Sequence, residues 1–226
     1  LVVPGDRERA CEAAMERAGI LEERLGAPTE AIKALDQLIR ELDPNHLEAH
    51  TALRRLYETR GEFDAAVRIA EREMYLAPEP ARKIARGLEI GQICRDRLNN
   101  PTRALQAYTR VLDLEPEQDE ALSAAADLLA RLGRWKEHVA MLERTLAVLP
   151  AEDADARRTL IQRIATVTAD KLRDPKAAFG WWCRAHAEAG DDQTLADLRR
   201  AGETHGLWRE LADVLAEERK RALAGP

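Results

Sequence analysis

The sequence is short of aromatic side chains, cysteine and long apolar runs, and each shortage narrows what the protein can be. Aromatic residues make up 4% of its 226 residues, so a hydrophobic core has to consist mainly of alanine and leucine. No apolar run approaches the roughly 18 residues of a membrane-spanning helix, and we therefore expect no membrane as a partner. The three cysteines, Cys11, Cys94 and Cys183, lack the even number and regular spacing of a disulfide framework. We expect them to be buried free thiols in the reducing cytoplasm.

Motifs of catalysis and of metal or phosphate binding are also missing. The five histidines are scattered, and none stands at a metal-ligand spacing such as His-Glu-x-x-His. Cys183 and His186 lie three residues apart in one predicted helix, where two ligands would share a face, but no further ligands accompany them. There is no glycine-rich phosphate loop and no pairing of a nucleophile with a base. The sequence therefore predicts a protein that is not an enzyme, with no catalytic residue, metal or cofactor.

A basic excess is absent as well. The net charge is −6 with 34% charged residues, whereas nucleic-acid-binding proteins usually carry a basic patch or stripe. We therefore expect no nucleic acid as a partner, and RNA binding is kept as a minor alternative. The basic residues are mostly arginine rather than lysine, which is typical of a GC-rich genome and favours a bacterial source.

What the sequence does contain is a threefold repeat. A Leu-x-x-Pro-x-x-Ala segment recurs with its prolines at Pro28, Pro101 and Pro175. A second marker, a glycine two residues before an aromatic residue, recurs with nearly the same period. Two unrelated markers that share one period, of about 73 residues, indicate a repeat architecture. The glycines of the second marker are Gly61, Gly133 and Gly206.

Each copy of the repeat predicts four helices that form two hairpins. Runs rich in Ala, Leu, Glu and Arg favour helix and alternate with Gly and Pro breaks, and no segment shows the period-two pattern of a strand. The units are expected at about 7–79, 80–152 and 153–226, within one helical-repeat domain that covers residues 1–226. Because the chain begins with Leu1 rather than Met, we expect it to be a segment of a longer protein.

Local signals predict where the helices begin. Proline suits the first turn of a helix, where its missing N–H costs nothing, and Asn100 and Asp174, just before two of the prolines, are favoured N-caps. Ala27 is the weak cap of the three. We also expect Leu1–Asp6 to be a short lead-in segment, and two later helices to begin near Ile84 and Arg157.

The hairpins resemble the tetratricopeptide repeat. Two of them run from proline to proline, at 44–78 and 116–150, and their length of about 34 residues is that of the repeat. The departures from its pattern are Arg54 and Ala126, where the repeat usually has glycine, and His138, where it has alanine. The matching residues in the best hairpin are Leu53, Tyr57, Gly61, Ala66, Ala70 and Pro78.

The resemblance implies an all-α solenoid of about six stacked antiparallel hairpins that winds into a right-handed superhelix. The first helices of the hairpins would line a concave groove for a peptide or a partner protein, so the implied function is a protein–protein interaction scaffold. The alternative is a regulatory or accessory repeat portion of a larger enzyme or sensor. A groove lined by charged residues favours the scaffold, whereas a closed apolar pocket would favour the alternative.

Candidate partner contacts follow when the second hairpins are aligned on their glycines. The alignment places Arg55, Asp127 and Arg200 at one position of the groove-lining helices. Glu58 and Glu203 match each other one turn later. The competing interpretation is that these residues form ordinary solvated ion pairs, as surface helices commonly do.

Two adjacent tryptophans are the one unusual pair. Trp182 occupies the position of Leu35 and Tyr108 in the other units, so we expect it in the core. Trp181 stands where the other units have alanine. It either fills space between hairpins or stays exposed as an anchor for a partner, because tryptophan is enriched at binding hot spots. Trp181 therefore joins the candidate partner contacts.

The ends of the chain suggest an unfinished array. The last predicted helix, Leu207 to about Leu223, has an apolar stripe that includes Trp208, and its other side is polar enough to meet solvent, as a terminal repeat requires. The chain nevertheless starts with apolar residues and has no distinct capping helix. We therefore expect at least one end to present a stacking surface and to support end-to-end self-association.

Overall fold

The computed structural model describes residues 4–224, and these residues form twelve α-helices and two π-helical turns, with no strand among them. The chain divides into two compact units, residues up to 121 and residues from 122 onwards. Unit 1 contains α1 (Pro4–Gly19), η1 (Ile20–Arg24), α2 (Pro28–Gln37), η2 (Leu38–Leu42), α3 (Leu47–Thr59), α4 (Phe63–Leu76), α5 (Pro80–Asp96), α6 (Pro101–Leu114) and the start of α7 (Asp119–Arg131). Unit 2 contains the rest of α7, then α8 (Trp135–Val148), α9 (Ala154–Asp170), α10 (Pro175–Ala189), α11 (Asp192–His205) and α12 (Trp208–Ala224).

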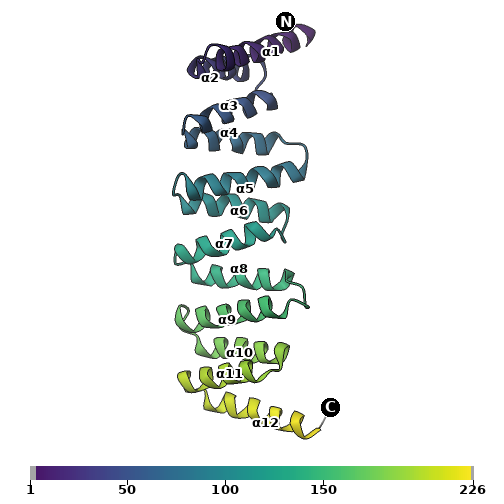
Figure 1. Cartoon of the computed structure of the whole chain (residues 1–226), viewed down its shortest axis with the longest axis vertical. Coiled ribbons are helices and arrows are strands. Elements are labelled where there is room, and N and C mark those ends of the chain that lie inside the picture. Colours follow the sequence, from purple (N-terminus) through teal and green to yellow (C-terminus); the bar gives the residue numbers. More distant parts are fainter. Residues whose placement is uncertain (1–3, 225–226) are drawn as a thin grey trace. The chain divides into compact units, whose positions relative to one another are not determined.

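Within each unit, helices that are consecutive in the chain pack against one another. In unit 1 every helix from α1 to α6 contacts the next one, and in unit 2 the same holds from α8 to α12 (Figure 1). We call the odd-numbered helices first helices and the even-numbered helices second helices of their hairpins. The predicted all-α class with stacked helical hairpins is thereby confirmed. The division into three units at 7–79, 80–152 and 153–226 stays a prediction.

The Leu-x-x-Pro segments form the same tight turn in all three copies. One residue in each turn has a positive φ, namely Gly26, Asn99 and Arg173. The residue that follows it donates its backbone N–H to the carbonyl oxygen six residues earlier, at 2.8–3.1 Å in the three copies. Each turn therefore closes the end of one helix and places a proline at the first position of the next.

The predicted caps in these turns are confirmed. The side chain of Asn100 accepts the backbone N–H of Arg103 at 3.0 Å, and that of Asp174 accepts the N–H of Ala177 at 2.9 Å. Each bond satisfies one N–H that the first turn of a helix otherwise leaves without a partner. Ala27 begins α2 with a similar backbone conformation but makes no side-chain bond.

The repeated glycines end the first helices of the second hairpins. At all three glycines φ lies between 68° and 73°, a left-handed conformation that strains any residue with a Cβ atom. The next residue donates its N–H to the carbonyl oxygen five residues earlier, at 2.8–3.0 Å, which is the main bond of a Schellman motif. The period of the glycines is therefore the period of a helix-ending turn.

The cores consist mainly of alanine and leucine, as the low aromatic content predicts. Unit 1 nevertheless buries one large ring, that of Tyr108 in α6. A Cβ atom at Gly91 of α5 would lie 2.6 Å from this ring, and one at Gly87 would lie 2.5 Å from Val111. The close approach of α5 and α6 therefore depends on the two glycines. Of the three free cysteines, Cys11 and Cys94 are buried, as predicted, and Cys183 is partly buried.

Several helix boundaries differ from the prediction. The expected lead-in, Leu1–Asp6, is already helical from Pro4, and its first three residues lie outside the described part of the chain. Helices α5 and α9 begin four and three residues earlier than predicted. Proline occupies the first position of α5, and Asp153 caps α9. The π-helical turns η1 and η2, which follow α1 and α2 directly, were not evident from the spacing of apolar residues.

Two tryptophans are less buried than predicted. Trp182, expected in the core, is only partly buried and packs at the margin of a cluster that contains Phe179. Trp208, expected in the apolar stripe of the last helix, is 61% exposed. It is the first residue of α12, and the close contact with Gly202 of α11 is made by Leu211, almost one turn later.

Candidate functional site

Polar contacts join consecutive first helices in both units. The partners are about one hairpin apart in sequence, so each contact ties a hairpin to its neighbour. In unit 1 the contacts are Glu22 of η1 with Arg55 of α3 at 2.7 Å, Arg54 of α3 with Glu89 of α5 at 3.2 Å, and Gln92 of α5 with Glu120 of α7 at 2.7 Å. In unit 2 they are Asp127 of α7 with Arg163 of α9 at 3.1 Å, Gln162 of α9 with Asp197 of α11 at 3.0 Å, and Arg158 of α9 with Asp191 at 2.6 Å.

Two of the predicted partner contacts belong to this series. Arg55 and Asp127 each reach the first helix of a neighbouring hairpin, and their side chains are 58% and 64% exposed. Exposed ion pairs contribute only about 0–1 kcal/mol. Both side chains can therefore leave their present partners for a ligand at little cost.

The other predicted contacts lie in different surroundings. Arg200 approaches only Asp197 of its own helix, at 3.7 Å, and Glu203 is exposed. Trp181 of α10 is partly buried against the core of unit 2, and the guanidinium of Arg184 lies 5.4 Å from its ring centroid. Trp181 thus lies on a second helix, apart from the candidates on first helices. The sixth candidate, Glu58, belongs to a charged cluster of unit 1.

That cluster surrounds Glu73 of α4, whose side chain is 3% exposed. Its Oε2 atom accepts the Nε–H group of Arg54 at 2.9 Å and forms an ion pair with Nε of Arg86 at 3.0 Å. Glu58 accepts from Arg54 at 2.6 Å, and Glu89 accepts from both arginines. Helices α3, α4 and α5 are therefore joined by one charged network, which balances the charge of a carboxylate that could not otherwise be buried.

A pocket of about 320 Å³ opens beside this network, between α3 and α5 with α4 at its base. Its polar lining residues are Thr51 of α3, Glu73 of α4, and Arg82, Arg86 and Glu89 of α5. Sequence reasoning missed Glu73. The available signal was its position ten residues after the start of its helix, because the residue ten positions after the starts of α2, α6 and α10 is buried and apolar. The apolar residues at that position are Leu38, Val111 and Ala185.

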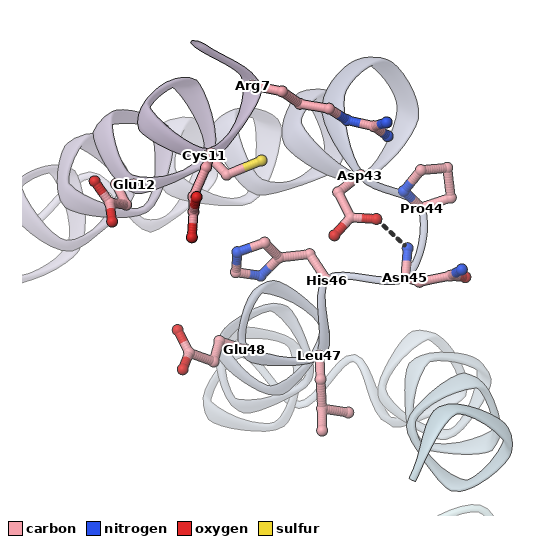
Figure 2. A pocket seen from close by; sticks show the side chains of 10 residues that line it. Arg7, Cys11, Glu12, Asp43, Pro44, Asn45, His46, Leu47 and Glu48 are labelled. Carbon is pink, nitrogen blue, oxygen red and sulfur yellow. Dashed lines mark hydrogen bonds between the residues drawn. The ribbon is translucent and has the colours of Figure 1, made fainter. Parts of the chain in front are cut away.

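A larger pocket, of about 860 Å³, lies between α1 and the loop that leads into α3 (Figure 2). Arg7, Cys11 and Glu12 of α1 face Asp43 and His46 across it. The carboxylate of Asp43 accepts the backbone N–H of Asn45 at 3.0 Å, and Nδ1 of His46 accepts the N–H of Ala49 at 3.1 Å. The loop is thus held by its own side chains, and the pocket it borders is polar.

Unit 2 also has a pocket between two consecutive first helices. It measures about 360 Å³ and opens between α9 and α11, with Trp182 of α10 at its base. Its polar residues are Gln162, Arg163 and Thr166 of α9 and Asp197 of α11. Asp197 accepts the amide of Gln162, which places one of the contacts between first helices at the edge of the pocket.

The pair Cys183 and His186 lies beside a further pocket, between α10 and α12. His186 is buried and contacts Thr194 at 3.1 Å and Glu218 at 3.4 Å. Burial raises the pKa of the Cys183 thiol, as it does for Cys94, so both favour the unreactive protonated form. Over residues 4–224 no group of three or more His, Cys, Asp or Glu side chains is placed to hold a metal ion. None of the described helices is both long and apolar enough to cross a bilayer.

Models of the tetratricopeptide repeat family match the chain at two adjacent segments, residues 13–46 and residues 49–84. The segments lie mostly in the hairpins α1–α2 and α3–α4 and include the matching residues from Leu53 to Pro78, whereas the hairpin at 116–150 lies outside both. No curated protein matches the chain in sequence at a significant level.

Several solved structures are similar to this chain. A chain of the Naa15/Naa10 complex bound to HypK-THB is 16% identical and superposes with a TM-score of 0.59, over 96% of this chain and 34% of that one. YrrB, a tetratricopeptide-repeat protein with an unusual peptide-binding site, is 17% identical with a TM-score of 0.44, over 86% of this chain and 97% of its own. A tetratricopeptide-repeat protein from Parabacteroides merdae is 16% identical with a TM-score of 0.45, over 92% of this chain and 78% of its own.

Proposed function

This chain belongs to the tetratricopeptide-repeat family, and on that premise we propose that it is a non-catalytic scaffold for protein–protein interaction. Its ligand is a peptide or a segment of a partner protein. The binding surface is the face formed by the first helices of its hairpins. No cofactor or metal takes part in this function.

The observation that supports this proposal is that pockets open between consecutive first helices. They occur between α1 and α3, between α3 and α5, and between α9 and α11. Their linings are rich in charged and polar side chains, which suit the backbone and side chains of a peptide. A closed apolar pocket would favour a regulatory or accessory portion of an enzyme or sensor. The net charge of −6 favours a protein partner over a nucleic acid.

Within this surface, Arg55, Asp127 and Arg200 are the proposed contacts for charged groups of the ligand, with Glu58 and Glu203 one turn away. The present ion pairs of Arg55, Asp127 and Arg200 are exposed or loose and can be exchanged for pairs with a ligand. Trp181 is proposed as an additional contact from a second helix.

The test is selection of binding peptides from a displayed random library against the whole chain, followed by fluorescence anisotropy of the selected peptides. Charge reversal at two proposed contacts, Arg55→Glu with Arg200→Glu, is expected to weaken binding about tenfold or more, because close charge pairs at interfaces contribute strongly. The matched control reverses Arg110 of α6 and Lys176 of α10, exposed cations on second helices with loose ion pairs of 3.7 and 3.6 Å. Failure to select any binding peptide, or equal effects of both reversals, would contradict the proposal.

A further inference from the structure

We propose that the pocket between α3 and α5 is a recognition site for a primary carboxamide, the side chain of an asparagine or glutamine in the bound peptide. This inference rests on the proposed function, since it assigns a preference to one position of the same binding surface. The observations that support it are the unused hydrogen-bonding capacity of Glu73 and the side chains that surround Glu73 in the pocket.

The carboxylate of Glu73 is used on one side only. Arg54 donates its Nε–H to Oε2 and Arg86 pairs with the same oxygen, whereas Oε1 is buried and has no hydrogen-bond partner among the described residues. Nearly all buried polar atoms in proteins have a partner, and a charged acceptor without one is costly. Glu73 lines the pocket, and in the proposed complex a donor group of the ligand hydrogen-bonds to this oxygen.

The position of Glu73 supports a role other than packing. In the first hairpins, the tenth residue after the start of the second helix (α2, α6 or α10) is apolar and buried. In the second hairpins, the residue at this position is polar. There it is Glu73 in α4, Thr145 in α8 and Glu218 in α12. Thr145 donates its hydroxyl to the carbonyl of Met141 in the preceding turn, so it is satisfied within its own helix. Glu73 combines nearly complete burial with an unsatisfied oxygen.

The hydrogen-bonding groups that line the pocket complement those of a carboxamide. Thr51 donates its hydroxyl to the carbonyl of Leu47 at 3.0 Å, so its Oγ1 can act only as an acceptor toward a ligand. Arg82 is 63% exposed, and among the described residues its side chain forms only a loose pair with Glu79, at 3.4 Å, so its N–H groups are available as donors. Two acceptors and one donor match the two N–H groups and the carbonyl oxygen of a primary carboxamide.

Other groups match this set less well. A lysine ammonium has three donors and no acceptor for Arg82, and a carboxylate has no donor for Glu73. The charged side chains that line the pocket are also balanced, with Arg82 and Arg86 against Glu73 and Glu89. A second charge brought into this site would be left unpaired, which is unfavourable. The volume of about 320 Å³ is at the low end for ligand pockets, so it suits a side chain rather than a larger ligand.

The test uses the whole chain and a small probe, Nα-acetyl-glutamine N-methylamide, with the corresponding glutamate, lysine and methionine derivatives for comparison. Binding is followed by the NMR shifts of backbone amides at Thr51, Ala77 and Ala85, which border the pocket. The glutamine derivative is expected to shift these amides at concentrations where the other three do not. An equal or stronger response to the lysine or glutamate derivative would overturn the carboxamide assignment.

Two substitutions on the exposed rim test the assigned groups without disturbing the buried network. Arg82→Ala and Thr51→Val are each expected to lower the affinity for the glutamine derivative about tenfold, the effect of losing one hydrogen bond to a polar ligand group. The matched controls are Arg110→Ala, at an arginine of similar exposure, and Thr59→Val, at a threonine that makes the same hydroxyl-to-carbonyl bond in α3. If the controls weaken binding as much, the pocket is not the site.

Peptide selection separates this inference from the proposed function. Selected peptides that bind the chain without a preference for asparagine or glutamine, and equally well after Arg82→Ala, overturn the pocket assignment and leave the scaffold function standing. Failure to select peptides, together with specific binding of the glutamine derivative, contradicts the proposed function and supports the pocket. If no peptide is selected and the glutamine derivative does not bind, both the scaffold function and the pocket assignment are contradicted.

Discussion

The pockets between α3 and α5 and between α9 and α11 both open between consecutive first helices but differ in the residue that the intervening second helix contributes. Glu73 of α4, nearly fully buried, forms the base of the first. Trp182 of α10, partly buried, forms the base of the second. The stacking of hairpins therefore determines where a pocket opens, whereas one residue of the intervening second helix determines what the pocket can bind.

A second difference explains why the tryptophan remains accessible. Trp182 takes the place of Tyr108 in the next copy of the repeat, and Ala165 takes the place of Gly91. In unit 1 the ring of Tyr108 lies against the backbone of α5, in space that a Cβ atom at Gly91 would occupy. In α9 a methyl group takes that space, and Trp182 carries a larger ring. The aromatic side chain is therefore buried in one copy and half-buried in the other.

The largest effect is expected at the base of the charged pocket. Glu73→Ala removes the carboxylate that holds Arg54 and Arg86, so the free energy of unfolding should fall by about 3 kcal/mol, as for other broken buried ion pairs. Urea denaturation followed by circular dichroism measures the change. The control is Glu71→Ala, two residues away in α4, whose side chain is partly exposed and pairs loosely with Arg103 and Arg110. Its expected loss is under about 1 kcal/mol, and equal losses would show that the network does not stabilise unit 1.

The second-largest effect tests why the ring of Tyr108 is buried whereas that of Trp182 is only half-buried. Gly91→Ala should lower the free energy of unfolding by about 1–3 kcal/mol, because the new methyl group overlaps the Tyr108 ring in a well-packed core. Gly180→Ala in α10 is the control, since nothing lies within 4 Å of the added Cβ atom. There the substitution should stabilise the helix by up to about 1 kcal/mol. A neutral Gly91→Ala variant, measured in the same denaturation experiment, would mean that α5 and α6 can separate without cost.

The smallest effects concern the turns, where the units differ at a single cap. Asp174→Ala in unit 2 should cost about 1 kcal/mol, because it removes the acceptor of the Ala177 N–H. Ala27→Asp in unit 1 should gain a similar amount, since Ala27 has nearly the backbone angles of Asp174 but no side-chain acceptor. Thermal unfolding of the two variants should therefore shift the midpoint in opposite directions. Shifts of the same sign would contradict the equivalence of the turns.

The sequence alone was sufficient for the repeats, the helical class, most helix boundaries and both side-chain caps. Those features depend on residues close together in the chain, such as a proline and the acceptor before it, or a glycine at a helix end. Among the candidate contacts, the counted period predicts one position for Arg55, Asp127 and Arg200, and these residues lie on the first helices α3, α7 and α11. Whether these residues bind a partner stays a prediction.

The base of each pocket was decided only by the tertiary structure. Nothing near Glu73 in the sequence indicates that two arginines, one from the preceding helix and one from the following helix, converge on a single oxygen atom. In the same way, the burial of Tyr108 and the exposure of Trp182 depend on whether the facing helix carries a glycine or an alanine. Burial and pairing are properties of neighbouring helices at contact distance, and a pattern within one helix does not contain them.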